Sequence, residues 1–552
     1  MPFEFKFPYN IDGQYSRRVA YFSMEFAVHQ CLKVYAGGLG FLAGSHMRSA
    51  YELKQNIVGV GILWKYGYYD QIRNADGRMN VLFQEKIYGF LEKTDLRFAI
   101  QVSGKNVVVT AYYLPPEIFH TAPIFFLSTD LPENDYLAQT ICHKLYDSNP
   151  ETRIAADILL GDGGATLLEK LRWYPDIYHL NESHGLPLAL HLLKKTKNIN
   201  DVKQKLRFTN HTPEAGGNPQ TNIFLLERMG FFCGIPLSDI FAITSISSDT
   251  LNHTLLALQM SGKANAVSNM HLQTLREMWK DAKQICEIIS ITNAQSFSYW
   301  ADKEMYTAME NDDDKALSDL KKKAKKNLFE EVADQNGEIY SEDILTIVFA
   351  KRFGNYKRPG LLLQNPERFR KLVTNPNQPV QIIWAGKPYP MDYDAIALFD
   401  RIVNVCKTYS NCSTLVGYEL KLSRLLKQGA DIWLNVPRLT HEASGTSGMT
   451  AAMNGAINLS TNDGWYPEFV LHGINGFVLP DTDPKLPAHQ LDETDADSLY
   501  DALENTLIPM YYNAPDQWIS VMKKSMKDVS VRFDSHRMAD AYYQLMYVPV
   551  QV

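Results

Sequence analysis

Short apolar runs that alternate with longer helical patterns constrain the fold of this chain more than any other feature. Such runs, each followed by a helical pattern, are typical of parallel sheets that are covered by helices. We therefore predict an α/β fold. The clearest candidate strands lie at 57–63, 124–127, 206–209, 344–350, 380–385 and 432–436.

The length of 552 residues, with 45% hydrophobic residues, is enough for two or more large domains, because a domain typically has ~100–200 residues. The strand pattern pauses between 300 and 337, where a polar helical stretch carries an acidic cluster and then a run of lysines. We interpret this stretch as a solvated helix that leads into a second domain. The expected organisation is a first domain at 1–338, a second at 339–514, and a helical segment at 515–552 that packs back across the domains.

Charge and cysteine content disfavour several classes of function. The net charge of −7 offers no global attraction to nucleic acid or to an anionic membrane. The six cysteines include no C-x-x-C pair, which disfavours structural zinc and indicates reduced thiols, and we predict no metal site. No apolar run approaches the ~20 residues of a membrane span, and the first residues do not resemble a secretion signal. We expect a cytoplasmic protein.

Two segments have a composition suited to binding anions. The glycine-rich turn at 37–40 allows backbone N–H groups to approach an oxyanion, although a tight turn without a ligand is an alternative. Its spacing matches neither common nucleotide-binding signature. The second segment follows the candidate strand at 344–350, where the carboxyl edge of a parallel sheet would open into a crevice. Its cations are Lys351, Arg352, Lys357 and Arg358.

The alternative for the second segment is a basic surface loop that is solvated and binds no ligand. Tyr356, which lies among the cations, is interpreted either as a hydrogen-bonding partner of sugar or phosphate or as a packed aromatic ring. An anion site in this loop would stabilise a phosphate whose charge develops in the transition state.

Seven segments, in the same order along the chain, resemble the shorter bacterial α-glucan phosphorylases. The resemblance implies two Rossmann-like domains that face a central cleft, the glycosyltransferase B fold, with retaining glucosyl transfer in the cleft. It also leaves assembly as a homo-oligomer open. The segments are YFSMEF at 21–26, AGGLGFLAG at 36–44, HLNESH at 179–184, FTNHTP at 208–213, AKRFGNYKR at 350–358, WLNVPR at 433–438 and EASGTSGMT at 442–450.

The resemblance also assigns roles to individual residues. The implied catalytic residues are His211, Arg352, Lys357 and Glu442, where the backbone carbonyl of His211 supports the positively charged transition state. The implied substrate-binding residues are Gly37, Gly38, Leu39, Asn293, Tyr356, Glu442, Ser444 and Gly445. The implied phosphate or cofactor pocket comprises Lys351, Arg352, Lys357, Thr446, Ser447, Gly448 and Thr450.

Thr450 departs from the family pattern. It stands where the family's EASGT-x-x-MK motif has the lysine that forms a Schiff base with pyridoxal phosphate. A hydroxyl cannot form an imine, and the sequence has no lysine between 442 and 460, so we expect no covalent pyridoxal phosphate.

Three functions remain open from the sequence. The first is a retaining glucosyltransferase that takes a nucleotide-activated sugar and a glucan or other glycosyl acceptor. The second is an α-1,4-glucan phosphorylase that holds pyridoxal phosphate without a covalent bond. The third is a glucan-binding or regulatory protein without catalysis. Neither nucleic acid nor a membrane is expected as a partner.

Overall fold

A computed structural model describes residues 3–244 and 248–550, and these residues form two compact units. Among the described residues, unit 1 comprises 3–69, 83–296 and 535–550, and unit 2 comprises 70–82 and 297–534. Each unit is therefore assembled from segments that are distant in sequence.

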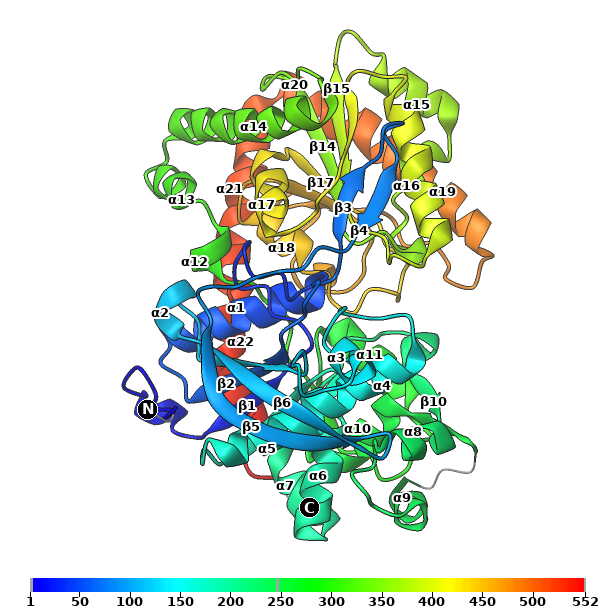
Figure 1. The fold of residues 1–552 in the computed structure, drawn as a ribbon. Helices are drawn as coiled ribbons and strands as arrows, with labels where there is room; N and C mark the ends of the chain where they lie inside the picture. The colour runs from blue at the N-terminus through cyan, green and yellow to red at the C-terminus, as the bar shows by residue number, and fades with distance from the viewer. Residues whose placement is uncertain (1–2, 245–247, 551–552) are drawn as a thin grey trace. The chain divides into compact units, whose positions relative to one another are not determined.

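Unit 1 is built on a nine-stranded sheet that is parallel except at one edge, where β6 runs antiparallel to both of its neighbours (Figure 1). The strands in spatial order are β13 (Glu287–Ser290), β12 (Lys263–Ala266), β9 (Leu206–Thr209), β8 (Ile177–Asn181), β1 (Val19–Phe22), β2 (Ile57–Ile62), β7 (Ile124–Ser128), β6 (Lys105–Leu114) and β5 (Glu92–Val102). A short antiparallel pair consists of β10 (Gln220–Asn222) and β11 (Thr250–Asn252).

The helices of unit 1 mostly lie between consecutive parallel strands. They are α1 (Gly38–Glu52), α2 (Pro116–Phe119), α3 (Tyr136–Thr140), α4 (Pro150–Ile158), α5 (Gly164–Lys170), α6 (Pro187–Thr196), α7 (Ile199–Lys205), α8 (Ile223–Met229), α9 (Leu237–Thr244), α10 (His253–Met260), α11 (Asn269–Met278) and α22 (Ser535–Ala541). Helix α22 packs beside α1, where the Ser49 and Ser535 hydroxyls lie 2.6 Å apart.

Unit 2 contains a six-stranded sheet in which all neighbouring strands are parallel. Its order is β16 (Cys412–Leu415), β15 (Val380–Ala385), β14 (Leu345–Ala350), β17 (Ile432–Asn435), β18 (Ile457–Ser460) and β19 (Phe477–Val478). Residues 70–82 add an antiparallel pair, β3 (Asp70–Arg73) and β4 (Met79–Leu82). Every residue of β14 and β15 is buried, as expected for strands covered on both faces.

Helices cover both faces of the unit 2 sheet (Figure 1). Side chains of α14, α17 and α18 share one core with Val348 and Ile383, whereas Phe369 of α15 packs against Trp384 on the opposite face. The helices are α12 (Phe297–Trp300), α13 (Lys303–Glu310), α14 (Asp314–Asn336), α15 (Pro366–Val373), α16 (Tyr393–Cys406), α17 (Leu420–Gly429), α18 (Ser447–Ala452), α19 (Ala488–Ala502), α20 (Ile508–Asn513) and α21 (Pro515–Arg532).

The six candidate strands are confirmed, since they correspond to β2, β7, β9, β14, β15 and β17. Helix α14 is confirmed as well, and local sequence explains both of its ends. The Asp313 carboxylate accepts the Ala316 N–H at the first turn, and Gly337 ends the helix with a φ of 74°.

The interpretation of this helix as solvated is wrong for two of its lysines. Lys321 and Lys325 lie one turn apart on the same face and are buried. The ammonium of Lys325 is 2.6 Å from the Asp431 carboxylate, and that of Lys321 donates to the carbonyls of Gln428 and Asn454. Burial lowers the pKa of Lys321 to about 7. The neighbouring lysines of the run are exposed, so composition alone did not separate the two faces.

The compact units differ from the expected segments in their bounds. Residues 297–338 belong to unit 2, where α14 packs on the sheet, whereas the boundary of the first domain was expected at 338. Helix α21 belongs to unit 2 and α22 to unit 1, so the expected segment at 515–552 is divided.

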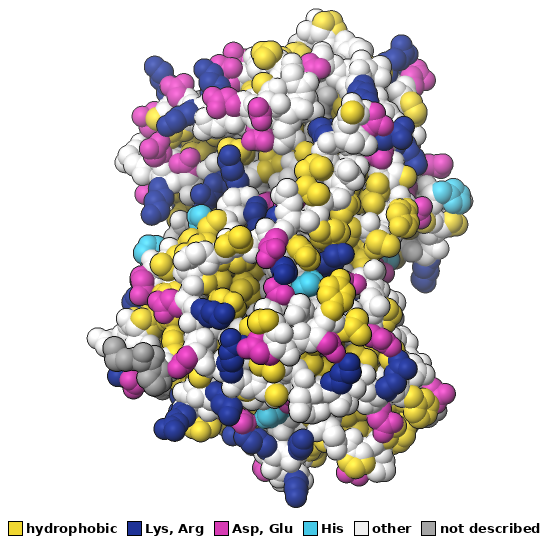
Figure 2. Space-filling model, in the orientation of Figure 1, with side chains coloured by type: hydrophobic (Ala, Val, Ile, Leu, Met, Phe, Trp, Pro, Cys, Tyr) yellow, Lys and Arg dark blue, Asp and Glu magenta, His cyan; other side chains and the backbone are white. Residues whose placement is uncertain are grey.

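Acidic and basic side chains are interspersed over the face shown in Figure 2. Among the described residues, no helix is both long and apolar enough to cross a membrane.

Candidate functional site

The order of strands in unit 2 reverses between β14 and β17, and ligands commonly bind at such a point, outside the carboxyl ends of the strands. The Nζ atom of Lys351, directly after β14, donates to Oδ1 of Asn435 at the end of β17. Burial and the charge of Lys357 lower the pKa of Lys351 far below the usual lysine range, although Glu442 opposes this shift. The buried surroundings therefore disfavour the charged form of Lys351.

Lys357 and Glu442 form a buried ion pair beside this point. A short turn, Asn355–Lys357, carries the lysine, and the Tyr356 ring lies 4.9 Å from its Nζ atom. Burial lowers the pKa of Lys357, but the charge and the hydrogen bond of the nearby Glu442 carboxylate oppose this effect, and the pKa of this lysine is raised overall. The pair thus keeps one positive and one negative group together in a dry environment, which is stable only while both partners are present.

The carboxylate of Asp463 fixes the loop that carries Glu442. Its Oδ2 atom accepts the N–H groups of His441 and Glu442 at 3.0 and 2.8 Å, and Oδ1 accepts that of Gly464 at 2.9 Å. Burial, together with the Glu442 charge, raises the pKa of Asp463 to about 7 despite these bonds. A side chain at Gly464 would collide with the Ser444 carbonyl, since its Cβ would lie 2.4 Å from that oxygen. Glycine therefore lets the two loops pack closely.

Ser444 offers a polar group that the chain itself does not satisfy. Its side chain is buried, and its Oγ atom has no hydrogen-bond partner among the described residues. Gly445 follows with a φ of 81°, a conformation that favours glycine. A buried hydroxyl without a partner is costly, so the position suits a ligand hydroxyl.

The two arginines of the basic loop have different surroundings. Arg352 is exposed and lies close enough to Lys357 to act on its charge. Arg358 is buried, pairs with Asp492 and Asp495, and donates to the Val436 carbonyl at 2.7 Å. Arg358 thus ties the loop to α19 and is not part of the site.

In unit 1 the strand order reverses between β1 and β8. His211 follows β9, the other neighbour of β8, and its N–H donates to Glu182 Oε1 at 2.5 Å, while its Nε2 lies 2.7 Å from Asn181 Oδ1. Burial lowers the pKa of His211 to about 3, so the imidazole is neutral and donates from Nε2.

Sequence reasoning did not single out Glu182, which directly follows β8. Its backbone has φ 72° and ψ 170°, a region that costs about 1–3 kcal/mol for residues other than glycine. Burial raises the pKa of the Glu182 carboxyl to about 6, although the His211 N–H opposes the shift. Its place directly after a buried strand was the available signal.

The glycine-rich turn of unit 1 binds a carboxylate of the chain itself. Oε2 of Glu25 accepts the N–H groups of Ala36, Gly37 and Gly40 at 2.7, 3.1 and 3.2 Å. The turn is thus an anion-binding arrangement, but the Gly37 N–H is engaged internally. Gly38 and Leu39 begin α1, and their assignment to substrate stays a prediction.

Asn293 is also placed in unit 1, after β13. Its side chain is buried, and its Oδ1 atom has no partner among the described residues. Like Ser444, it is a buried polar group that suits a ligand.

Comparison with known proteins identifies the family. The Phosphorylase family model, described as carbohydrate phosphorylase, matches residues 298–470. An uncharacterised protein of Methanocaldococcus jannaschii is 43% identical over 96% of this chain and 99% of its own length. A maltodextrin phosphorylase of Thermococcus litoralis is 32% identical over 96% of this chain and 70% of that protein. This chain belongs to the carbohydrate phosphorylase family. A glycogen phosphorylase of Aquifex aeolicus is 28% identical over 97% of this chain and 87% of its own length.

In this member of the family, Thr446, Ser447, Gly448 and Thr450 form the start of α18. The Thr450 side chain is buried, and its hydroxyl donates to the Ser447 carbonyl at 3.0 Å. A hydroxyl that is already bound to the helix backbone offers no amine for an imine. The residues at this position do not fit a Schiff-base cofactor.

Proposed function

We propose that this carbohydrate phosphorylase homologue is a retaining glucosyltransferase that takes a nucleotide-activated sugar and works without covalent pyridoxal phosphate. The observation that carries the proposal is the buried Lys357–Glu442 pair at the carboxyl end of the unit 2 sheet. The same loops carry Arg352 and the Ser444 hydroxyl, which has no hydrogen-bond partner in the described part of the chain. Cations for a phosphate and polar groups for sugar hydroxyls thus lie on adjoining loops.

The proposed reaction needs no further co-reactant. The bond between the anomeric carbon and the donor phosphate oxygen breaks, and a bond to the acceptor hydroxyl oxygen forms on the same face of the sugar. The acceptor hydroxyl loses its proton to the departing phosphate. Because negative charge grows on that phosphate, Arg352 and Lys357 would stabilise the transition state more than the bound donor.

Glu442 has a second role in this scheme. Its carboxylate holds Lys357 in place and can accept a hydrogen bond from a sugar hydroxyl, and a sugar hydroxyl could also bond to Ser444 Oγ, which has no partner among residues 3–244 and 248–550. A bound phosphate would favour the charged form of Lys351, which burial disfavours, because an opposite charge raises a lysine pKa.

Phosphorolysis of an α-1,4-glucan is the second candidate, because relatives over most of this chain are a maltodextrin phosphorylase and a glycogen phosphorylase. The same cations would then bind orthophosphate, and pyridoxal phosphate would be held without a covalent bond. Thr450 is the reason that this candidate ranks second.

One assay separates the candidates. The purified full-length protein is first examined by absorbance for a bound cofactor, and then incubated either with nucleotide sugars and malto-oligosaccharides or with orthophosphate and glucan. Nucleotide release with glucan elongation supports the proposal, and glucose 1-phosphate formation alone supports the second candidate. Oligosaccharide binding without turnover in either reaction would mean a glucan-binding protein, and both catalytic proposals would fail.

A further inference from the structure

Residues 70–82 belong to unit 2, although the segments before and after them in sequence belong to unit 1. They form the hairpin of β3 and β4, which lies against β16, the edge strand of the unit 2 sheet, and against α16. Arg73 donates to the Thr414 hydroxyl on β16 at 3.2 Å. The Met79 N–H donates to the Asp400 carboxylate on α16 at 3.1 Å. The hairpin is thus fixed to this edge.

The Gln71 side chain of this hairpin reaches the loops that follow β15 and β16. It is buried, its Nε2 atom donates to the Gly386 carbonyl at 2.9 Å, and its Oε1 atom accepts the Gly417 N–H at 3.1 Å. An ion pair between Lys387 and Glu419, at 2.8 Å, joins the same two loops. One buried amide therefore connects two loops at the carboxyl end of the sheet.

The loop after β15 holds the backbone on both sides of Arg352. The Lys351 N–H donates to the Ala385 carbonyl at 3.2 Å, and the Phe353 N–H donates to the Lys387 carbonyl at 3.3 Å. These two hydrogen bonds fix the point at which the arginine side chain leaves the backbone.

Gly386 lies between these two acceptors and allows the close contact, because a Cβ atom there would collide with the Lys351 carbonyl. The loop after β16 reaches the same segment, since the Tyr418 hydroxyl donates to the carbonyl of Ala350, the last residue of β14, at 3.1 Å. Both loops that Gln71 connects therefore contact the start of the basic loop.

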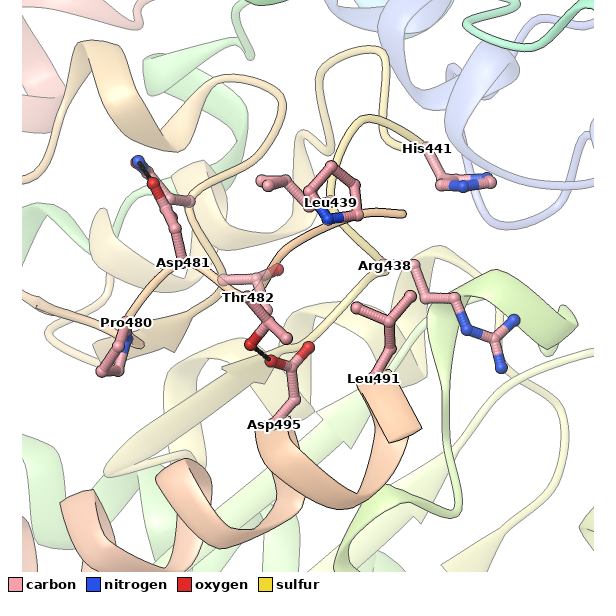
Figure 3. Close-up of a pocket in the computed structure, with 11 residues that line it drawn as sticks. Arg438, Leu439, His441, Pro480, Asp481, Thr482, Leu491 and Asp495 are labelled. Atoms are coloured by element: carbon pink, nitrogen blue, oxygen red, sulfur yellow. Dashed lines mark hydrogen bonds between the residues drawn. The ribbon is translucent and has the colours of Figure 1, made fainter. Parts of the chain in front are cut away.

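The loop after β17 holds the basic loop on its other flank, because β14 lies between β15 and β17. The Arg438 N–H donates to the Tyr356 carbonyl at 2.9 Å, and the Arg438 guanidinium contacts Asp492 of α19 at 2.7 Å. Figure 3 shows the hollow that Arg438 and His441 line on this flank. Its cavity of about 30 Å³ suits water and is too small for a sugar. Both flanks are therefore frames around the basic loop.

Lys351, Arg352 and Lys357 on the basic loop make up the anion site. We propose that Gln71 is a positioning residue of this site: it connects the loops after β15 and β16, which in turn fix the backbone at the start of the basic loop. The inference rests on the proposed function, because that function assigns the cations to a phosphate. Groups that are held in place before binding lose less freedom when the ligand arrives, so loss of the Gln71 contacts should weaken phosphate binding.

Gln71→Met and Gln381→Met are matched variants that test the inference. Gln381 is also buried, and its amide accepts the Ser341 N–H at 2.8 Å and donates to the Ser341 carbonyl at 3.1 Å, but it lies near the amino end of β15. Each variant loses the hydrogen bonds of one buried amide, so both should be less stable in urea unfolding. Calorimetric titration of the full-length protein with inorganic phosphate should show about tenfold weaker binding in Gln71→Met, the effect of about one hydrogen bond, and unchanged binding in Gln381→Met.

Gly386→Ala is an independent second variant. Its methyl group would push the loop after β15 away from the Lys351 carbonyl while Gln71 stays in place, so the folded variant should also bind phosphate more weakly. Unchanged phosphate affinity in Gln71→Met or in Gly386→Ala would overturn the inference. So would an equal loss of affinity in Gln71→Met and Gln381→Met, or no phosphate binding by the parent protein.

The proposed function is judged separately, by glucosyl transfer from a nucleotide sugar. Transfer by the parent protein, together with unchanged phosphate affinity in Gln71→Met, would keep the function and reject the positioning role of Gln71. Weaker phosphate binding in Gln71→Met, in a protein that transfers no glucosyl group, would keep the positioning role and reject the function.

Discussion

Two buried ion pairs at opposite ends of the same sheet allow the binding role of one of them to be tested. Lys325 pairs with Asp431, which precedes β17 and also accepts the N–H of Thr346 near the start of β14. Lys357 pairs with Glu442 beyond the carboxyl ends of these strands. Both lysines and both carboxylates are buried, so the two pairs are matched in chemistry and differ in location.

Replacing either lysine by methionine leaves a carboxylate buried without its partner. Loss of one partner from a buried pair typically costs about 3–5 kcal/mol, and we expect both Lys325→Met and Lys357→Met to lower the free energy of unfolding by this amount. Phosphate affinity should separate them. Lys357→Met loses a charged contact worth ~1.5–3 kcal/mol, which corresponds to about 10- to 150-fold weaker binding, whereas Lys325→Met should bind phosphate normally.

Urea unfolding gives the first quantity, and calorimetric titration with phosphate at a temperature where both variants are folded gives the second. Lys326→Met is the control for the loss of a lysine as such, because Lys326 is exposed and its ion pair with Glu342 should contribute little to stability. Full phosphate affinity in Lys357→Met, or an equal loss in both buried-pair variants, would refute the assignment of the anion site.

Three further predictions concern the site and the buried histidines. Arg352→Ala should lower turnover about 10²- to 10³-fold, because a charge that stabilises the transition state is lost. Arg370→Ala, at an exposed position on α15, should leave the rate unchanged. A normal rate in Arg352→Ala would contradict the role of Arg352 in charge stabilisation. Ser444→Ala should leave the free energy of unfolding unchanged or higher, because the Ser444 hydroxyl has no hydrogen-bond partner among the residues that the structure describes. The same variant should bind glucose 1-phosphate more weakly, and unchanged affinity by calorimetry would reject the sugar contact. Burial lowers the pKa of His46 to about 3, so its contribution to stability is present above the unfolded pKa of about 6.5 and is lost as the pH falls. His46→Phe should therefore lose about 2 kcal/mol less of its free energy of unfolding between pH 6.5 and 5 than the parent protein does, as measured by urea titrations. An unchanged pH dependence in this variant would exclude His46 as the titrating group.

The sequence was sufficient for the parts of the fold that depend on local pattern. The buried strand β15 is apolar at all positions but one, so its position could be predicted to the residue. The inward face of α14 could not, because Lys321 and Lys325 are buried by partners that come from distant loops. The lowered pKa of Lys351 likewise follows from its burial, which composition does not report.

The site was predictable where a motif lies on one loop. Glu442, Ser444 and Lys357 could be named from their motifs, and the structure places Glu442 and Lys357 in contact. The strained backbone of Glu182 and the Glu25 carboxylate in the glycine-rich turn could not be predicted, because both follow from how separate segments meet.

The return of residues 535–550 to unit 1 bears on how the protein is made. The Arg207 side chain, at the second residue of β9, donates to the carbonyls of Met546 and Val548, and the Tyr547 hydroxyl lies 2.7 Å from His179 Nδ1 on β8. Residues 297–534 of unit 2 are translated between these partners. Unit 1 therefore cannot make these contacts on the ribosome before residues 297–534 have emerged, and its nine strands, all made by Ser290, must wait for the tail that packs against them.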